Sequence, residues 1–121
     1  MGEARKGITF AFSTDTRPCE TLNRYTAGAD LLILEGMYAA EEKMPQALKN
    51  HHMLFREAAE IARKAAPGAL LLTHFSTSLE TPEDYLDGVR TIFEKTWTAK
   101  DGETITLRYP AEEEKAWISL C

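Results

Sequence analysis

The chain has 121 residues, 44% of them hydrophobic, which predicts one small domain, or a piece of a larger one, with enough apolar residues for a core. Its net charge of −5 disfavours a broad phosphate-binding surface, because nucleic-acid interfaces are normally basic, so any contact with nucleic acid should be local or metal-dependent. Two cysteines form no disulfide framework, and the sequence has neither a membrane-length apolar run nor a signal-peptide core, which predicts a soluble, cytoplasmic protein.

The first part of the chain alternates apolar and helix-forming stretches. Residues 7–13 are rich in Ile, Thr and Phe and predict a strand. A helix is expected over residues 18–27, because a proline occupies its first position and Gly28 follows its end. The continuous apolar run 30–35 predicts a strand covered on both faces. Residues 36–50 are polar and irregular, which indicates a loop with one turn of helix.

The alternation continues through the second part of the chain. Alanines at helical spacing predict a helix over residues 53–66, ended by a Pro-Gly pair, and residues 69–74 predict a third buried strand. Thr81, followed by proline and acidic residues, is typical of a helix cap, and the helix should run to about residue 95. The dipeptide Asp101-Gly102 predicts a hairpin between its flanking segments.

This order of elements predicts an α/β fold, arranged βαβαβα with a terminal hairpin, around a parallel sheet joined by right-handed crossovers. We assign residues 1–110 to the folded domain and residues 111–121, which include three consecutive glutamates, to an acidic tail or terminal helix. The sequence shows no internal repeat and no low-complexity segment that would divide the domain further.

Three ionisable residues stand at the carboxyl ends of the three predicted central strands: Asp15, Glu35 and His74. Ordinary turn chemistry is an alternative role for Asp15, and a core histidine bonded to backbone is an alternative for His74. The carboxyl ends of parallel strands meet at one edge of a sheet, where ligands bind in such folds. Three ionisable residues at equivalent positions favour a functional site over three separate turns.

The residue types suggest two kinds of chemistry. Carboxylate oxygen and imidazole nitrogen both bind zinc, so Asp15 and His74 are candidate ligands of a divalent metal. His52 lies at the start of the alanine-rich helix, where the dipole disfavours the charged imidazole, although by itself it is more typical of a solvated cap. Glu35 beside a histidine could instead form a proton-transfer pair, in which the carboxylate orients the ring.

The sequence resembles a known family over residues 6–108. Three stretches in the expected order and spacing carry the resemblance: FSTDTRPCETLNRYTAGADLLILEGMY, HHMLFREAAEIARKA and LLLTHFSTSLETPEDYLDGVRTIF. Together they are similar to the C-terminal half of ribonuclease Z-like proteins of the metallo-β-lactamase superfamily. The resemblance implies half of an αββα sandwich and a two-zinc site that hydrolyses a phosphodiester, classically trimming the 3′ end of precursor transfer RNA.

The resemblance assigns roles to four residues of this chain by their positions in the family's motifs. The resemblance implies that Asp15 bridges the two zinc ions, that His74 is the last histidine ligand, and that Glu35 and His52 assist proton delivery to the leaving oxygen. His52 fits this role better than His51, because it keeps the family distance to the following alanine-rich helix. Hydroxyl residues usually follow that histidine, but Met53 and Leu54 stand there in this sequence.

One departure from the family is large. The metal site of the family begins with an HxHxDH motif, whereas the three histidines of this chain are His51, His52 and His74, so a dizinc site cannot be completed by this chain alone. The leading hypothesis is therefore that the chain is the C-terminal part of a zinc-dependent endoribonuclease. It would be inactive alone and would act on RNA only together with a missing N-terminal half of the protein. The alternatives are a non-catalytic half-module that forms homo-oligomers or complements an N-terminal half, and an enzyme acting on another phosphodiester or ester.

Overall fold

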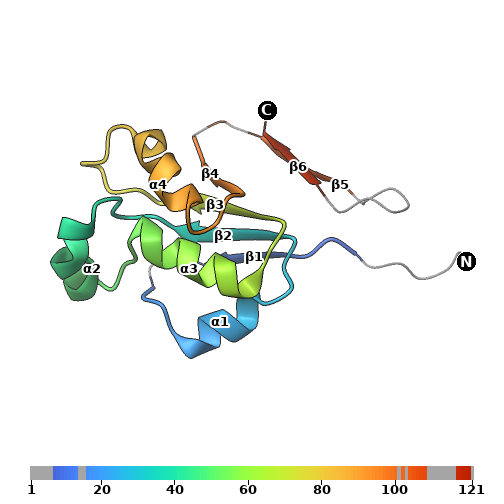
Figure 1. Ribbon diagram of the computed structural model, residues 1–121, viewed down its shortest axis with the longest axis horizontal. Coiled ribbons are helices and arrows are strands. Elements are labelled where there is room, and N and C mark those ends of the chain that lie inside the picture. The colour runs from blue at the N-terminus through green and yellow to red at the C-terminus, as the bar shows by residue number, and fades with distance from the viewer. Residues whose placement is uncertain (1–6, 14–15, 101, 103, 109–116, 121) are drawn as a thin grey trace, which may run out of the picture.

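Four parallel strands form the centre of the computed structural model, which describes residues 7–13, 16–100, 102, 104–108 and 117–120 (Figure 1). In chain order its elements are β1 (Phe10–Ser13), α1 (Glu20–Thr26), β2 (Leu31–Glu35), the 3₁₀ helix η1 (Glu41–Lys43), α2 (Met44–Asn50), α3 (Phe55–Ala65), β3 (Ala69–Thr73), the 3₁₀ helix η2 (Pro82–Tyr85), α4 (Leu86–Arg90), β4 (Thr96–Thr98), β5 (Ile105–Arg108) and β6 (Trp117–Leu120). No helix in the described part of the chain is long and apolar enough to cross a bilayer.

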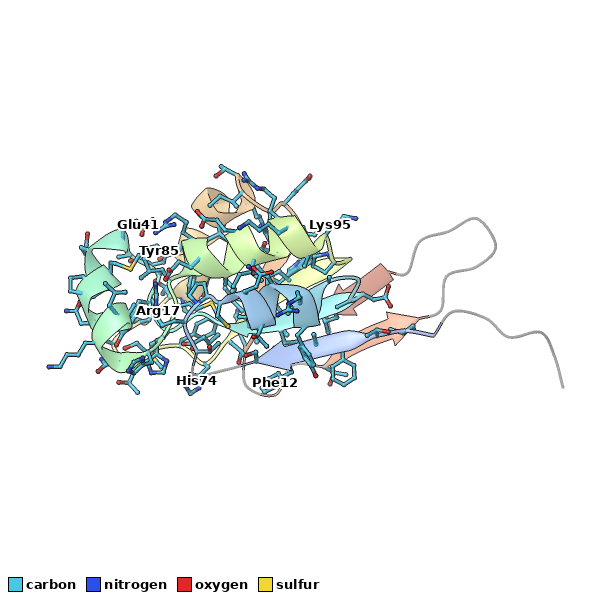
Figure 2. The ribbon with its side chains drawn as sticks, turned by 90° about the horizontal axis from the view of Figure 1, so that it is seen from below. Phe12, Arg17, Glu41, His74, Tyr85 and Lys95 are labelled. Carbon is cyan, nitrogen blue, oxygen red and sulfur yellow. The ribbon has the colours of Figure 1, made fainter. Side chains whose placement is uncertain are left out.

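The main sheet has the order β1-β2-β3-β4, and every neighbouring pair is parallel. This arrangement confirms the α/β fold that the alternation of elements predicts. Ser13 pairs with Leu34, and Glu35 pairs with Thr73, so the strands end at one common edge. Helix α2 lies beyond this edge in both views of the molecule (Figures 1 and 2). The fold therefore brings the residues that follow β1, β2 and β3 into one neighbourhood.

The two faces of the sheet have different surroundings. Helices α1, α3 and α4 lie on one face (Figures 1 and 2), where the in-register residues Ala11, Leu32 and Leu70 belong to the same core cluster as the fully buried Phe55 of α3. Strand side chains alternate between faces, so the residues in between point the other way. This second face carries Phe10, Phe12, Leu31, Ile33, Ala69, Leu71 and Trp97. It is apolar, and it has no helix over it among the described elements.

The helix expected over residues 81–95 is shorter and is divided between η2 and α4. Thr81 is the N-cap residue of η2, as the sequence predicts, but its side chain donates to the Asp84 carboxylate at 2.6 Å and makes no cap bond to the helix backbone. Helix α4 ends at Arg90, whose Nε donates to the carbonyl of Thr96 at 2.9 Å. This contact ties the end of the helix to the first residue of β4.

The two segments that flank Asp101-Gly102, which were predicted to form a hairpin, pair with other strands. Strand β4, on one side of that dipeptide, pairs with β3 in the parallel sheet. Strand β5, on the other side, pairs with β6 in a separate antiparallel ribbon. The terminal hairpin is thus formed by β5 and β6, and β6 lies within the stretch 111–121 that the sequence assigned to a tail. Local turn chemistry favours a hairpin, but the buried edge of β3 offers β4 a better partner.

Candidate active site

The candidate site lies at the carboxyl edge of the sheet. Glu35 is the last residue of β2, and His74 follows directly after β3. Arg17 and His74 lie near this edge in Figure 2. Asp15, the predicted bridging metal ligand, lies outside the described residues, between Ser13 and Thr16. Its metal-binding role therefore stays a prediction.

Glu35 is a fully buried carboxylate with a partner on each oxygen. Its Oε1 accepts from the backbone N–H of Thr16 at 2.5 Å, and its Oε2 lies 2.8 Å from Nδ1 of His52. A buried carboxylate is costly unless it is hydrogen-bonded or paired, and here both conditions are met. The structure thus brings together the two residues that the sequence analysis assigned to proton transfer.

The structure also separates His52 from the neighbouring His51. His51 caps α2 in the left-handed conformation, with φ of 59°, and its side chain is exposed. The chain then turns: the His52 N–H donates to the carbonyl of Ala47 at 2.9 Å, and Met53 is completely buried. This turn directs the His52 ring toward Glu35, and the ring is only 16% exposed. The left-handed cap explains why two consecutive histidines have different environments.

His74 also has a left-handed backbone, with φ of 56°, which is uncommon for a residue with a side chain. Such conformations cost about 1–3 kcal/mol and cluster at functional sites. The His74 side chain is exposed, so it is not a buried core histidine. Its ring centroid lies 5.8 Å from that of His52, and the residue lines a cavity of about 530 Å³ together with Thr73 and Lys100. His74 and the Glu35–His52 pair are therefore neighbours.

Two residues at this edge escaped the sequence analysis. Arg17 makes two hydrogen bonds to the Glu57 carboxylate, at 2.5 and 2.6 Å, and one to the carbonyl of His52, at 2.9 Å. Glu57 in turn accepts from the backbone N–H of Leu54 at 3.0 Å, at the start of α3. A glutamate three residues after a helix cap is a known capping signal, so Glu57 was recognisable from sequence. Its partner Arg17, 40 residues away in the sequence, could not be recognised from such a local signal.

The donor set fits a metal ion in kind but not in number. Imidazole and carboxylate at one sheet edge are suitable zinc ligands, yet a catalytic zinc ion normally has three protein ligands. His74 and Asp15, whose metal-binding roles are predictions from the sequence, would supply two. In the part of the chain that the structure describes, no three His, Cys, Asp or Glu side chains gather into a metal-binding group. Further ligands must come from outside these residues for a complete site.

Comparison with known proteins defines the class of the chain. A family model described as the beta-lactamase superfamily domain matches residues 3–75. The metallo-beta-lactamase fold protein YhfI from Bacillus subtilis superimposes with a TM-score of 0.69 at 24% identity, over 93% of this chain and 40% of that protein. The chain therefore belongs to the beta-lactamase superfamily and has the metallo-β-lactamase fold.

Curated relatives narrow the assignment. Ribonuclease Z of Clostridium acetobutylicum is 46% identical over 101 residues, which are 84% of this chain and 33% of that protein. Ribonuclease Z of Clostridium botulinum is 43% identical over 109 residues, which are 90% of this chain and 35% of that protein. Human tRNase Z, short form, superimposes with a TM-score of 0.60 at 23% identity, over 78% of this chain and 32% of that protein. The chain is thus similar to proteins named ribonuclease Z, and it spans about a third of the length of these relatives.

Proposed function

We propose that this chain is the part of a ribonuclease Z-type phosphodiesterase that carries the acid–base pair and two metal ligands, acting in the cytoplasm on the 3′ end of precursor transfer RNA. The observation that carries the proposal is the 2.8 Å contact between the buried Glu35 carboxylate and His52, beside His74. The relatives named ribonuclease Z support the substrate class.

The geometry suggests a role for each member of the pair. Because the Glu35 carboxylate accepts the Nδ1 proton of His52, proton delivery to the leaving oxygen takes place from Nε2. The Glu35 carboxylate fixes the orientation of the ring, and the Thr16 N–H prevents the carboxylate from rotating away. His52 is thus the general acid, and Glu35 orients it.

The metal centre would be shared with residues outside the described set. Asp15 and His74 would hold the ions on the side of this chain, and zinc is the metal that we propose, on the basis of carboxylate and imidazole donors. When bound, the ions supply Lewis-acid activation of the phosphate and of the attacking water. The remaining ligands would come from the HxHxDH segment of an N-terminal half.

The decisive experiment uses the protein joined to such a segment, either encoded upstream or supplied by a clostridial relative. Its zinc content and its cleavage of a precursor transfer RNA with a 3′ trailer are measured for the parent and for Asp15→Asn. Asparagine keeps the shape of the side chain but loses its charge, so we expect loss of one or both ions and of activity by several orders of magnitude. Full zinc occupancy in Asp15→Asn would show that Asp15 holds only a turn.

The same proposal makes a prediction for the chain by itself. The purified 121-residue polypeptide should not cleave precursor transfer RNA, even with added zinc or manganese, because it lacks the other ligands. A ribonuclease Z assayed in parallel is the positive control. Robust turnover by the isolated chain, abolished by a chelator, would contradict the fragment hypothesis.

A second candidate function is a half-module that associates with its own copies or with an N-terminal half. The second face of the sheet favours it, because Phe10 and Phe12 on the edge strand β1 are 63% and 56% exposed. Exposed apolar patches of this kind mark interaction surfaces. The edge strand also offers unpaired backbone groups for a further strand.

Sedimentation tests this second function. We expect the parent chain to sediment as a dimer or higher oligomer and Phe12→Lys, which places a charge on the second face, to shift it toward monomer. Tyr25→Lys is the matched control, because Tyr25 is 72% exposed but lies on α1, away from that face. A parent chain that is a compact monomer at high concentration would rule out self-association.

A further inference from the structure

We propose that Arg17 is a positioning residue that ties the segment after β1 to the start of α3 and thereby sets the place of His52 against Glu35. The catalytic consequence rests on the function proposed above, but the positioning itself is a property of the folded chain. Arg17 lies two residues after Asp15, so it connects the predicted metal-ligand segment with the acid–base pair.

The contacts of Arg17 have the geometry of a clamp. Both terminal nitrogens of the guanidinium donate to the two oxygens of Glu57, and Nη1 also donates to the main-chain carbonyl of His52. The planar fork of arginine matches a carboxylate in this bidentate manner, which fixes direction as well as distance. A bond to the His52 carbonyl restrains the backbone from which the imidazole extends.

Glu57 transmits the restraint to the helix. Its Oε1 accepts both the Arg17 donor and the N–H of Leu54, and its side chain is only 8% exposed. Leu54, at the cap position, has no hydroxyl to bond the first turn, so the usual reciprocal capping box is half present. Arg17 therefore stabilises the one carboxylate that caps α3, directly after the turn that carries His52.

Thr16, the neighbour of Arg17, holds Glu35, the other member of the acid–base pair. The Thr16 N–H bonds Glu35, and the Arg17 side chain bonds the His52 carbonyl, so two consecutive residues hold both partners. A change in this short segment would move Glu35 and His52 relative to each other. The 2.8 Å distance between them consequently depends on residues 16–17 as well as on the two side chains themselves.

Arg17 could instead be a cation that binds the phosphate backbone of a substrate. Its contacts argue against this role, because the guanidinium is already engaged by a carboxylate and a carbonyl and its side chain is 25% exposed. The two roles differ in kinetics. Loss of a substrate-binding cation raises KM, whereas loss of a positioning residue lowers kcat with KM nearly unchanged.

The first test is spectroscopic and needs no activity. In the 121-residue chain labelled with ¹⁵N-histidine, the Nδ1 proton of His52, bonded to Glu35, should give a downfield resonance protected from exchange with water. We expect Arg17→Ala to abolish that resonance while the backbone spectrum remains that of a folded chain. Arg56→Ala is the matched control, because it removes an arginine of α3 that bonds Glu41 and Glu60.

Glu57→Gln is the second variant, and it decides the question if Arg17→Ala does not fold. Glutamine keeps an acceptor for the Leu54 N–H but loses the charge that holds Arg17. We expect its His52 resonance to exchange faster than in the parent, and Arg17→Lys, which cannot form the bidentate fork, to resemble it. An unchanged, protected His52 resonance in Arg17→Ala or in Glu57→Gln would overturn the proposal.

The kinetic test uses the protein completed with the HxHxDH segment. We expect Arg17→Ala to lower kcat about 10²-fold, the size of effect that a displacement of about 1 Å produces, with KM within about twofold. A rise in KM at unchanged kcat would overturn positioning in favour of substrate binding. The experiments distinguish failure of this proposal from failure of the proposed function. If the proposed function is wrong, Glu35 and His52 variants remain active, whereas Arg17→Ala still abolishes the His52 resonance.

Discussion

Helix α3 is held by two arginine–carboxylate clusters of opposite character. At its start, the inner cluster joins Arg17 to Glu57, whose side chain is 8% exposed. On its outer face, Arg56 bonds Glu41 and Glu60, whose side chains are 59% and 46% exposed. Those two carboxylates, Glu41 foremost, raise the pKa of the Arg56 guanidinium above its usual value. Both clusters look similar as contacts, yet only the inner one adjoins a buried site.

The difference teaches that burial decides the importance of an ion pair. Exposed pairs are screened by water and salt and contribute about 0–1 kcal/mol. Removing one partner of a buried pair leaves an uncompensated charge and costs several times more. The inner cluster should therefore govern the stability of the site, and the outer cluster should matter little. Four substitutions test this contrast, from the largest expected effect to the smallest.

Glu35→Gln should have the largest effect. It keeps an acceptor for the Thr16 N–H but removes the carboxylate that accepts from His52 and orients its ring. In the protein completed with the HxHxDH segment, we expect metal content to be kept and kcat to fall about 10²–10⁴-fold, the usual range for an acid–base group. Glu60→Gln, an exposed carboxylate on α3, is the control and should leave turnover unchanged. Equal turnover in both variants would contradict the assignment of Glu35.

Glu57→Ala should have the next largest effect, on stability. The change leaves the Leu54 N–H and the Arg17 guanidinium without their shared acceptor, and we expect a loss of about 2–3 kcal/mol in the free energy of unfolding. Urea unfolding followed by circular dichroism measures it. Glu60→Ala on the same helix should cost less than about 1 kcal/mol. The contrast between the clusters fails if the two losses are equal.

Gly36→Ala tests how tightly the start of α3 packs against the end of β2. A Cβ at this position would lie 2.6 Å from Cε1 of the buried Phe55 ring, so the ring or the strand end must move. Overpacking of this kind typically costs about 1–3 kcal/mol, and we expect a loss of about 1–2 kcal/mol by chemical unfolding. Gly88→Ala is the control, because a Cβ there meets nothing within 4 Å. A crystal structure of Gly36→Ala in which neither the Phe55 ring nor the end of β2 has moved would contradict this explanation.

Arg56→Ala should have the smallest effect. We expect a loss of about 0.2–1 kcal/mol at low salt that shrinks in high salt, because the pair is exposed. A raised arginine pKa means that titration of Arg56 itself removes no stabilisation below its ordinary pKa and removes it only in strong alkali. Between about pH 6 and pH 9 the difference from the parent should therefore stay constant. A salt-independent loss above about 2 kcal/mol would make the outer cluster equivalent to the inner one.

Short-range patterns predicted most of the architecture. Apolar runs marked the three central strands, and the alternation of strands with helices correctly indicated a parallel sheet. Parallel strands place their ends at one edge, so the proximity of Glu35 and His74 followed from order alone. The resemblance to ribonuclease Z-like proteins rested on motifs of the same local kind, and the comparisons confirm it.

Contacts between distant residues decided the rest. Strand β4 joined β3, not its neighbour across Asp101-Gly102, because burial against the sheet outweighs local turn preference. His52 is directed inward by the left-handed cap at His51, a conformation that sequence does not reveal for a non-glycine residue. Arg17 and Glu57, 40 residues apart, meet only once the sheet and α3 have packed. The sequence by itself determined which residues stand at the edge of the sheet, and the tertiary structure decided which of them touch, since hydrogen bonds and ion pairs depend on distances that only packing sets.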